Sequence, residues 1–158
     1  MLLALTIVTS CQMKTKTVSL DPVIAKTEVT KTLDSISSSL KAKDAKGFIA
    51  FLSEDGLFCG TDPTEMWDKA TYAKNITQML ADTTMHSDMN IDKREIRIEN
   101  DGNSAIVILQ FTPKWSKPIP VRNTMHLVKA NNKWMVDFSS VALIPDNKDL
   151  AKLAAAVK

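Results

Sequence analysis

The chain has few of the residues that build disulfide frameworks and metal sites. Its 158 residues include two cysteines, Cys11 and Cys59, and two histidines, His86 and His126. The histidines are far apart and lack the spacing of metal ligands. Cys59 has no internal partner once Cys11 is assigned to an N-terminal segment, as argued below. We therefore expect no structural disulfide, no metal site and no bound cofactor.

The chain also lacks a large excess of either positive or negative residues. Twenty Lys and Arg residues stand against 18 Asp and Glu residues, with a formal net charge of +2, and the two signs are mixed along the chain. No basic block with interleaved aromatic residues is present, which argues against a nucleic-acid partner. With 44% hydrophobic and 24% charged residues, the composition is that of a globular protein, and the length favours one domain.

The N-terminal apolar run, MLLALTIVTSC, is too short to cross a bilayer, which takes about 20 residues. It resembles the apolar region of a bacterial export signal that ends in a lipobox, with small residues before a cysteine. No Lys or Arg precedes the run, which departs from that pattern. The alternative is a buried strand or helix with an incidental cysteine.

The resemblance implies cleavage before Cys11 and a diacylglycerol on its thiol. Residues 1–10 are then the signal peptide and residues 11–20 a polar tether, followed by one domain over residues 21–158. We expect a lipoprotein of the bacterial cell envelope, held on the membrane through Cys11 on the periplasmic or surface side.

Apolar spacing predicts three helices in the first half of the domain. Asp21 and Pro22 supply a cap and a first helical residue for a helix to about residue 43. Asp44 caps a second, short helix that extends through Leu52. A short strand follows over residues 57–60, and the third helix runs over residues 69–81.

The second half alternates as strands over residues 91–99, 104–115, 121–130 and 133–141, with a last helix after Pro145. Asp101-Gly102 and Asn131-Asn132 suit tight hairpin turns. Helices on one face of a curved antiparallel sheet make an α+β fold. With the Asp101-Gly102 turn, the common core face of the two strands is Ile96, Ile98, Ala105, Val107, Leu109 and Phe111. Ile106 and Ile108 lie on the opposite face, so we expect both faces to be covered, the outer one by a second copy in a homodimer.

The last hairpin decides which side chains face the core. A two-residue turn at Asn131 and Asn132 pairs Met125 with Phe138 and Asn123 with Ser140. The face predicted to point inward is the apolar one: Asn123, Met125, Leu127, Trp134, Val136, Phe138 and Ser140. His126 and Asp137 pair on the outer face, where a solvated or interface ion pair is the expected role.

The order of elements resembles the SnoaL-like, or nuclear-transport-factor-2-like, superfamily over about residues 21–144. Three stretches carry the resemblance: Leu40–Asp44 with Phe51–Asp55, Gly60–Pro63 followed by Trp67, and Lys133-Trp134 at the start of the last strand. The resemblance implies a cone in which the curved sheet wraps the N-terminal helices around an open pocket. It also implies homodimers in many members, and Asp, His or Tyr as the acid–base groups of the members that are enzymes.

Three hypotheses about function follow. In the first, a small, mostly apolar molecule binds in the pocket, whose walls are Phe58, Trp67, Tyr72, Met125, Trp134 and Phe138. Asn123 and Ser140 would orient it. In the second, the chain is a cofactor-free isomerase or hydrolase that uses Asp62 or Tyr72. In the third, it is a structural or protein-binding module that works through the outer face of the sheet. The inward positions after Trp134 carry no acid or base, which favours the first.

Overall fold

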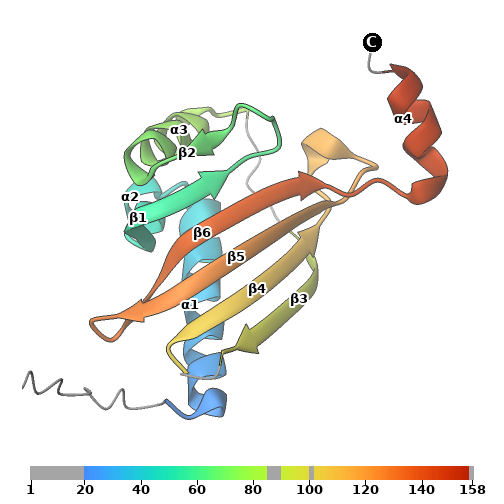
Figure 1. Ribbon diagram of the computed structural model, residues 1–158. Helices are drawn as coiled ribbons and strands as arrows, with labels where there is room; N and C mark the ends of the chain where they lie inside the picture. Colours follow the sequence, from blue (N-terminus) through green and yellow to red (C-terminus); the bar gives the residue numbers. More distant parts are fainter. Residues whose placement is uncertain (1–19, 85–89, 100–101, 157–158) are drawn as a thin grey trace, which may run out of the picture.

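The computed structural model describes residues 20–84, 90–99 and 102–156. It contains one curved, six-stranded sheet in the order β2-β1-β6-β5-β4-β3, and helix α1 crosses one face of this sheet (Figure 1). The expected α+β class is confirmed. The elements in chain order are α1 (Pro22–Lys41), α2 (Ala45–Ile49), β1 (Leu52–Cys59), β2 (Met66–Trp67), α3 (Lys69–Ala81), β3 (Ile91–Ile98), β4 (Ser104–Phe111), β5 (Val121–Ala130), β6 (Lys133–Leu143) and α4 (Leu150–Ala156).

The helices begin at the aspartates that the sequence offers as caps. The Asp21 carboxylate accepts a hydrogen bond from the backbone N–H of Val23 at 2.7 Å, and Asp44 accepts one from Gly47 at 2.8 Å. Both caps were predicted, and each satisfies a backbone N–H that has no partner inside its helix. Within the described ranges, no helix is long and apolar enough to span a membrane.

The core lies between α1 and the inner face of the sheet. Ala25, Val29 and Leu33 of α1 are almost fully buried. The strand side of the core comes from alternate positions, as the sequence pattern predicted: Ile96, Ala105, Val107, Leu109 and Phe111 are all buried. The β3–β4 register pairs Ile98 with Ala105 and Ile96 with Val107, so the predicted common face is confirmed.

The hairpin between β5 and β6 follows the predicted register only near its turn. Asn131 and Asn132 have φ angles of 50° and 61°, and Leu127 is opposite Val136 as expected. Beyond that pair the register shifts by one residue, because Asp137 is an extra residue that forms a β-bulge.

The bulge makes two predicted pairs wrong. Met125 is opposite Ser139 and not Phe138, and Asn123 is opposite Val141 and not Ser140. Phe138 and Ser140 therefore lie on the outer face, where His126 is opposite Phe138. The inward positions are taken instead by Ser139, which is 5% exposed, and by the partly buried Val141.

The edge of the sheet also differs from the prediction. Strand β1 begins at Leu52, which was assigned to the second helix, and it pairs parallel with β6, so one strand pair departs from the antiparallel pattern. The register of β1 is broken between Leu52 and Leu57. The alternation of inward and outward side chains is therefore interrupted, and the sequence pattern does not identify the whole of β1 as one strand. Strand β2 is only two residues long and was not predicted.

The C-terminal helix forms as predicted, at Leu150–Ala156, but it does not join the core. None of its described residues is buried, and Leu150 is 48% exposed. Figure 1 shows α4 projecting beyond the end of β6, away from the sheet.

The homodimer and the division of the chain into signal, tether and domain stay predictions, and Cys11 lies outside the described residues.

A carboxylate on α1 ties this helix to both strands of the last hairpin. Glu28 Oε2 lies 2.5 Å from Lys129 Nζ of β5 and accepts a hydrogen bond at 2.9 Å from the indole N–H of Trp134 in β6. The hydrogen bond from Lys129, and then that from Trp134, lower the pKa of Glu28 from its usual 4.5. Trp134 is 3% exposed, so this bond also satisfies the polar atom of a core side chain.

We predict that Glu28→Gln lowers the free energy of unfolding at neutral pH by about 0.5–1 kcal/mol, a range reduced for solvent screening of a partly exposed pair. Because the folded-state pKa lies below 4.5, the charged group stabilises the fold above that pH, and this stabilisation is lost as the pH falls through the folded-state value. The difference between wild type and variant should therefore shrink in acid, measured by urea unfolding. Glu95→Gln, at an exposed position of β3, is the control; an equal acid dependence in both variants would contradict the assignment.

Candidate functional site

A cavity of about 350 Å³ lies between the inner face of the sheet and the helices α1, α2 and α3. Its walls are mainly apolar side chains from both layers. The described residues that line it are Leu33, Ile36, Ser37, Leu40, Phe48, Leu52, Phe58, Trp67, Tyr72, Asn75, Ile76, Met79, Leu109, Phe111, Asn123, Met125, Val136, Ser139 and Val141. The volume is at the lower end of the roughly 300–1,000 Å³ that is usual for small-molecule sites.

Aromatic rings form one wall of this cavity around Tyr72 of α3. The ring of Phe58 stacks on Tyr72 with centroids 4.7 Å apart and an angle of 9° between planes, and Trp67 is stacked at 6.0 Å and 17°. Phe58 and Trp67 are brought together because they are paired across β1 and β2. A Cβ atom at Gly56 would lie 2.5 Å from the Phe58 ring, so any larger residue at this position would clash with the ring.

Tyr72 is the one ionisable residue among the described residues that line the cavity. Burial raises its pKa to about 12, because the low-dielectric surroundings disfavour the phenolate. The hydroxyl is therefore protonated at neutral pH and cannot act as a base there. Over the described ranges, no group of three His, Cys, Asp or Glu side chains is placed to hold a metal ion.

The polar part of the wall is an amide and a hydroxyl on neighbouring strands. Ser139 Oγ of β6 donates a hydrogen bond of 2.9 Å to Asn123 Oδ1 of β5. Ser37 of α1 and Asn75 of α3 add two more uncharged polar side chains to the lining. The cavity can thus hold an apolar body and form a few hydrogen bonds with it, and the described part of its wall presents no charge.

The structure brings five of the predicted pocket residues together and leaves three out. Phe58, Trp67, Tyr72, Asn123 and Met125 line the cavity. Trp134 is not among the lining residues, because it is buried against α1 and bonded to Glu28. Phe138 and Ser140 are directed to the outer face by the bulge at Asp137.

Sequence reasoning missed Ser139 as the polar partner of Asn123. One weak signal pointed to a register shift. Val141 is apolar, yet a register without a bulge places it on the outer face. With one extra residue before Phe138, both Ser139 and Val141 face inward, as they do in the structure. Ser37 and Asn75 were missed because their neighbours on α1 and α3 are core residues, and helical spacing alone does not mark a cavity.

Asp62, the other catalytic candidate, is an exposed turn residue that does not line the cavity. Its carboxylate accepts hydrogen bonds from the backbone N–H of Thr64 at 2.8 Å and from the Thr64 hydroxyl at 2.6 Å. The Thr64 hydroxyl and then the Thr64 N–H lower the pKa of Asp62 from its usual value. Asp62 and Tyr72 are therefore not part of one site.

His126 and Asp137 form the predicted pair on the outer face of the sheet, with His126 Nδ1 2.7 Å from Asp137 Oδ1. Glu99 Oε2 lies 3.7 Å from the other ring nitrogen. None of the three residues lines the cavity. The pair is separated from the cavity by the sheet, so the imidazole has no access to a molecule bound inside.

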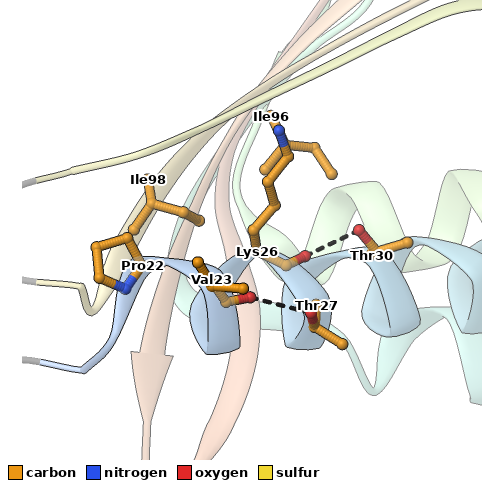
Figure 2. Close-up of a pocket in the computed structure, with 7 residues that line it drawn as sticks. All are labelled: Pro22, Val23, Lys26, Thr27, Thr30, Ile96 and Ile98. Carbon is orange, nitrogen blue, oxygen red and sulfur yellow. Dashed lines mark hydrogen bonds between the residues drawn. The ribbon is translucent and has the colours of Figure 1, made fainter.

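A second hollow, of about 410 Å³, opens between the first turns of α1 and strand β3 (Figure 2). Figure 2 shows Lys26 extending from α1 toward Ile96. The hydroxyls of Thr27 and Thr30 donate to the carbonyls of Val23 and Lys26 at 2.9 and 2.8 Å, so they are used within the helix. Among the described residues that line this hollow, no polar groups converge on one point, so it is not a candidate site.

Comparison with known proteins agrees with this geometry. Residues 29–140 match the family described as the SnoaL-like domain. No curated protein matches the chain.

Three solved structures illustrate the likeness in fold. A protein of unknown function from Pectobacterium atrosepticum aligns with a TM-score of 0.66 and 16% identity, over 77% of this chain and 92% of that chain. An NTF2-like protein of unknown function from Pseudomonas putida aligns at 0.65 and 12%, over 80% and 91%. An NTF2-like protein from Cytophaga hutchinsonii aligns at 0.63 and 14%, over 75% and 98%. The superfamily indicated by the sequence is thus confirmed at the level of the fold.

We predict that Tyr72, the one tyrosine of the chain, ionises near pH 12 in the folded protein. Since its usual pKa is 10.0, the protonated form stabilises the fold below pH 10, and this stabilisation is lost as the pH rises from there toward the folded-state pKa. Tyrosinate absorbance followed against pH measures this residue alone, and the same titration in denaturant is the control. A folded-state midpoint at or below the denatured one would contradict the burial of the ring.

Proposed function

Because this chain belongs to the SnoaL-like domain family, we propose that it is a lipid-anchored envelope protein that binds a small, mostly apolar and uncharged molecule in its cavity. The composition of the cavity wall carries the proposal. Of the nineteen described residues that line the cavity, fifteen are apolar or aromatic, and the other four are Ser37, Asn75, Asn123 and Ser139. The family by itself does not decide the function, since one fold hosts both enzymes and binding proteins.

The absence of an acid–base group from the described wall supports binding over catalysis. General acid–base catalysis needs a group whose pKa lies near the working pH. Tyr72 is far from that range because burial raises its pKa to about 12, and Asn and Ser side chains do not transfer protons near neutrality. An isomerase or hydrolase is the alternative; it would have to work without the Asp62 carboxylate, which is exposed in its turn.

The absence of charge from the described wall also limits what the ligand can be. Among the described residues, no Lys, Arg, His, Asp or Glu lines the cavity. A charged group placed there would lose its hydration without gaining a partner, which is strongly unfavourable. The ligand we propose is therefore neutral, with its apolar part against the aromatic wall around Tyr72.

Two adjacent serines with opposite orientations provide a matched test. We predict that Ser139→Phe, which fills the cavity from the inner face, weakens binding of the neutral fluorophore phenylnaphthylamine by about tenfold or more, since the ring occupies ligand volume and would overpack the site. Ser140→Phe adds the same ring to the outer face and should leave the affinity nearly unchanged.

Molecules extracted from the purified wild type and from both variants, identified by mass spectrometry, complete the test. A ligand should accompany wild type and Ser140→Phe and be missing from Ser139→Phe, with circular dichroism showing that all three proteins are folded. Equal loss of the fluorophore in both variants would contradict the assignment of the cavity.

For the lipid anchor, we predict that Cys11→Ala abolishes incorporation of a labelled fatty acid when the protein is made in a bacterium. The substitution should also release the protein from the membrane fraction. The reason is that the lipid is expected on the Cys11 thiol, and two acyl chains suffice for stable anchoring. Cys59→Ala is the control for the other cysteine of the chain. Incorporation that persists in Cys11→Ala, or a wild-type chain that keeps Met1, would contradict the anchor.

A further inference from the structure

We propose that the cavity selects neutral ligands that carry a carbonyl group, such as a ketone, an ester or an amide, and that Asn123 recognises the carbonyl oxygen. This inference rests on the proposed function, because it concerns what the same cavity binds. It goes beyond that function by naming the chemical group, the residue that reads it and the direction of the hydrogen bond.

The direction follows from the contact between Asn123 and Ser139. The side-chain amide of asparagine has an accepting oxygen and two donating N–H groups. Ser139 donates to the oxygen, Oδ1, at 2.9 Å. Its acceptor end is thus engaged by the protein, and the amide nitrogen makes no hydrogen bond to another described residue. Asn123 therefore presents donors to the cavity.

The apolar neighbours of this amide make its donors selective. Asn123 is flanked across the sheet by Leu109 of β4 and Val141 of β6, and all three line the cavity. A ligand that enters without an acceptor would displace water from the N–H groups and leave them unpaired. Leaving a buried donor without a partner costs more than an average hydrogen bond contributes, so such ligands bind more weakly than carbonyl compounds of the same shape.

The charge of the wall separates a carbonyl from a carboxylate. A carboxylate oxygen is the stronger acceptor, yet the cavity offers it no described Lys, Arg or His as a counterion. Two amide donors do not compensate for the desolvation of a full charge in an apolar cavity. Fatty acids and other anions are therefore excluded, whereas a neutral carbonyl compound needs only the donor that Asn123 supplies.

Ser139 acts as a positioning residue in this scheme. Its bond to Oδ1 fixes the orientation of the amide, and its own place on the inner face comes from the bulge at Asp137. Without the hydroxyl, the amide is free to rotate and offer oxygen or nitrogen, which weakens the preference for acceptors without blocking the cavity.

The experiment compares two fluorophores of nearly equal shape. Prodan (propionyl-dimethylaminonaphthalene) carries a ketone, and its emission shifts to the red when that ketone accepts a hydrogen bond. Its propyl counterpart has a methylene in place of the ketone. Wild type is expected to bind Prodan with red-shifted emission. Asn123→Leu, which keeps the size of the side chain but has no donor, should bind Prodan about tenfold more weakly, the effect of one hydrogen bond in an apolar site, and shift its emission to the blue.

The propyl compound should bind wild type more weakly than Prodan does, and it should bind Asn123→Leu more tightly than wild type, because leucine leaves no donor unpaired. Ser139→Ala should reduce the preference for Prodan by a smaller factor, and it provides a second variant if Asn123→Leu does not fold. Asn75→Leu tests the other amide of the wall. Ser140→Ala, on the outer face, is the control for Ser139→Ala and should leave the preference intact.

The outcomes separate this inference from the proposed function. If both fluorophores bind, and Asn123→Leu changes neither the Prodan affinity nor its emission, the role of Asn123 is overturned and ligand binding in the cavity stands. If Asn75→Leu removes the preference in place of Asn123→Leu, the recognising residue is wrong. If neither fluorophore binds wild type, the proposed function fails and this inference fails with it.

Discussion

The single extra residue at Asp137 is the constraint on which the character of the cavity depends. A strand alternates strictly between faces, so one inserted residue exchanges the two faces for every position after it. Upstream of the bulge, Trp134 and Val136 point inward; downstream, Ser139 and Val141 do. Without it, Phe138 would enter the cavity and Ser139 would face outward. The hydrogen bond between Ser139 and Asn123, and with it the polar part of the wall, exists because of this local irregularity.

The bulge is tolerated because the strand is fixed on both sides of it. On the turn side, Glu28 of α1 binds Lys129 and Trp134, which holds the hairpin against the helix. On the other side, β6 is paired with β5 and with β1, whose own register is irregular between Leu52 and Leu57. The two irregularities are opposite each other, since Leu52 is paired with Val136 and Leu57 with Phe138. Five steps along β1 therefore match two steps along β6.

Local chemistry explains which parts of the fold were predictable from the sequence. The caps at Asp21 and Asp44, the positive φ angles at Asn131 and Asn132, and the bounds of α3 depend on residues close to each other in the chain. The inner face of β3 and β4 was predictable because neither strand is interrupted within Ile96–Ile98 and Ala105–Phe111. Three features depend on contacts between distant segments: the parallel pairing of β1 with β6, the two-residue strand β2 and the bulge at Asp137. Residue spacing within one segment cannot predict them.

The same distinction explains why the site was predicted in part. Phe58, Trp67 and Tyr72 line the cavity and stack around one ring. Trp134 and Phe138 do not, because Trp134 is bonded to Glu28 of α1 and the bulge directs Phe138 outward. The polar partner was missed by one position, and that position changes the chemistry. The predicted partner, Ser140, would have placed a hydroxyl beside Asn123 without defining how the amide is oriented. Ser139 instead donates to the amide oxygen of Asn123, so the N–H groups of that amide are left for the cavity. The described residues of the wall carry no charge, so the bulge that places Ser139 beside Asn123 and orients this amide also affects what the cavity can distinguish.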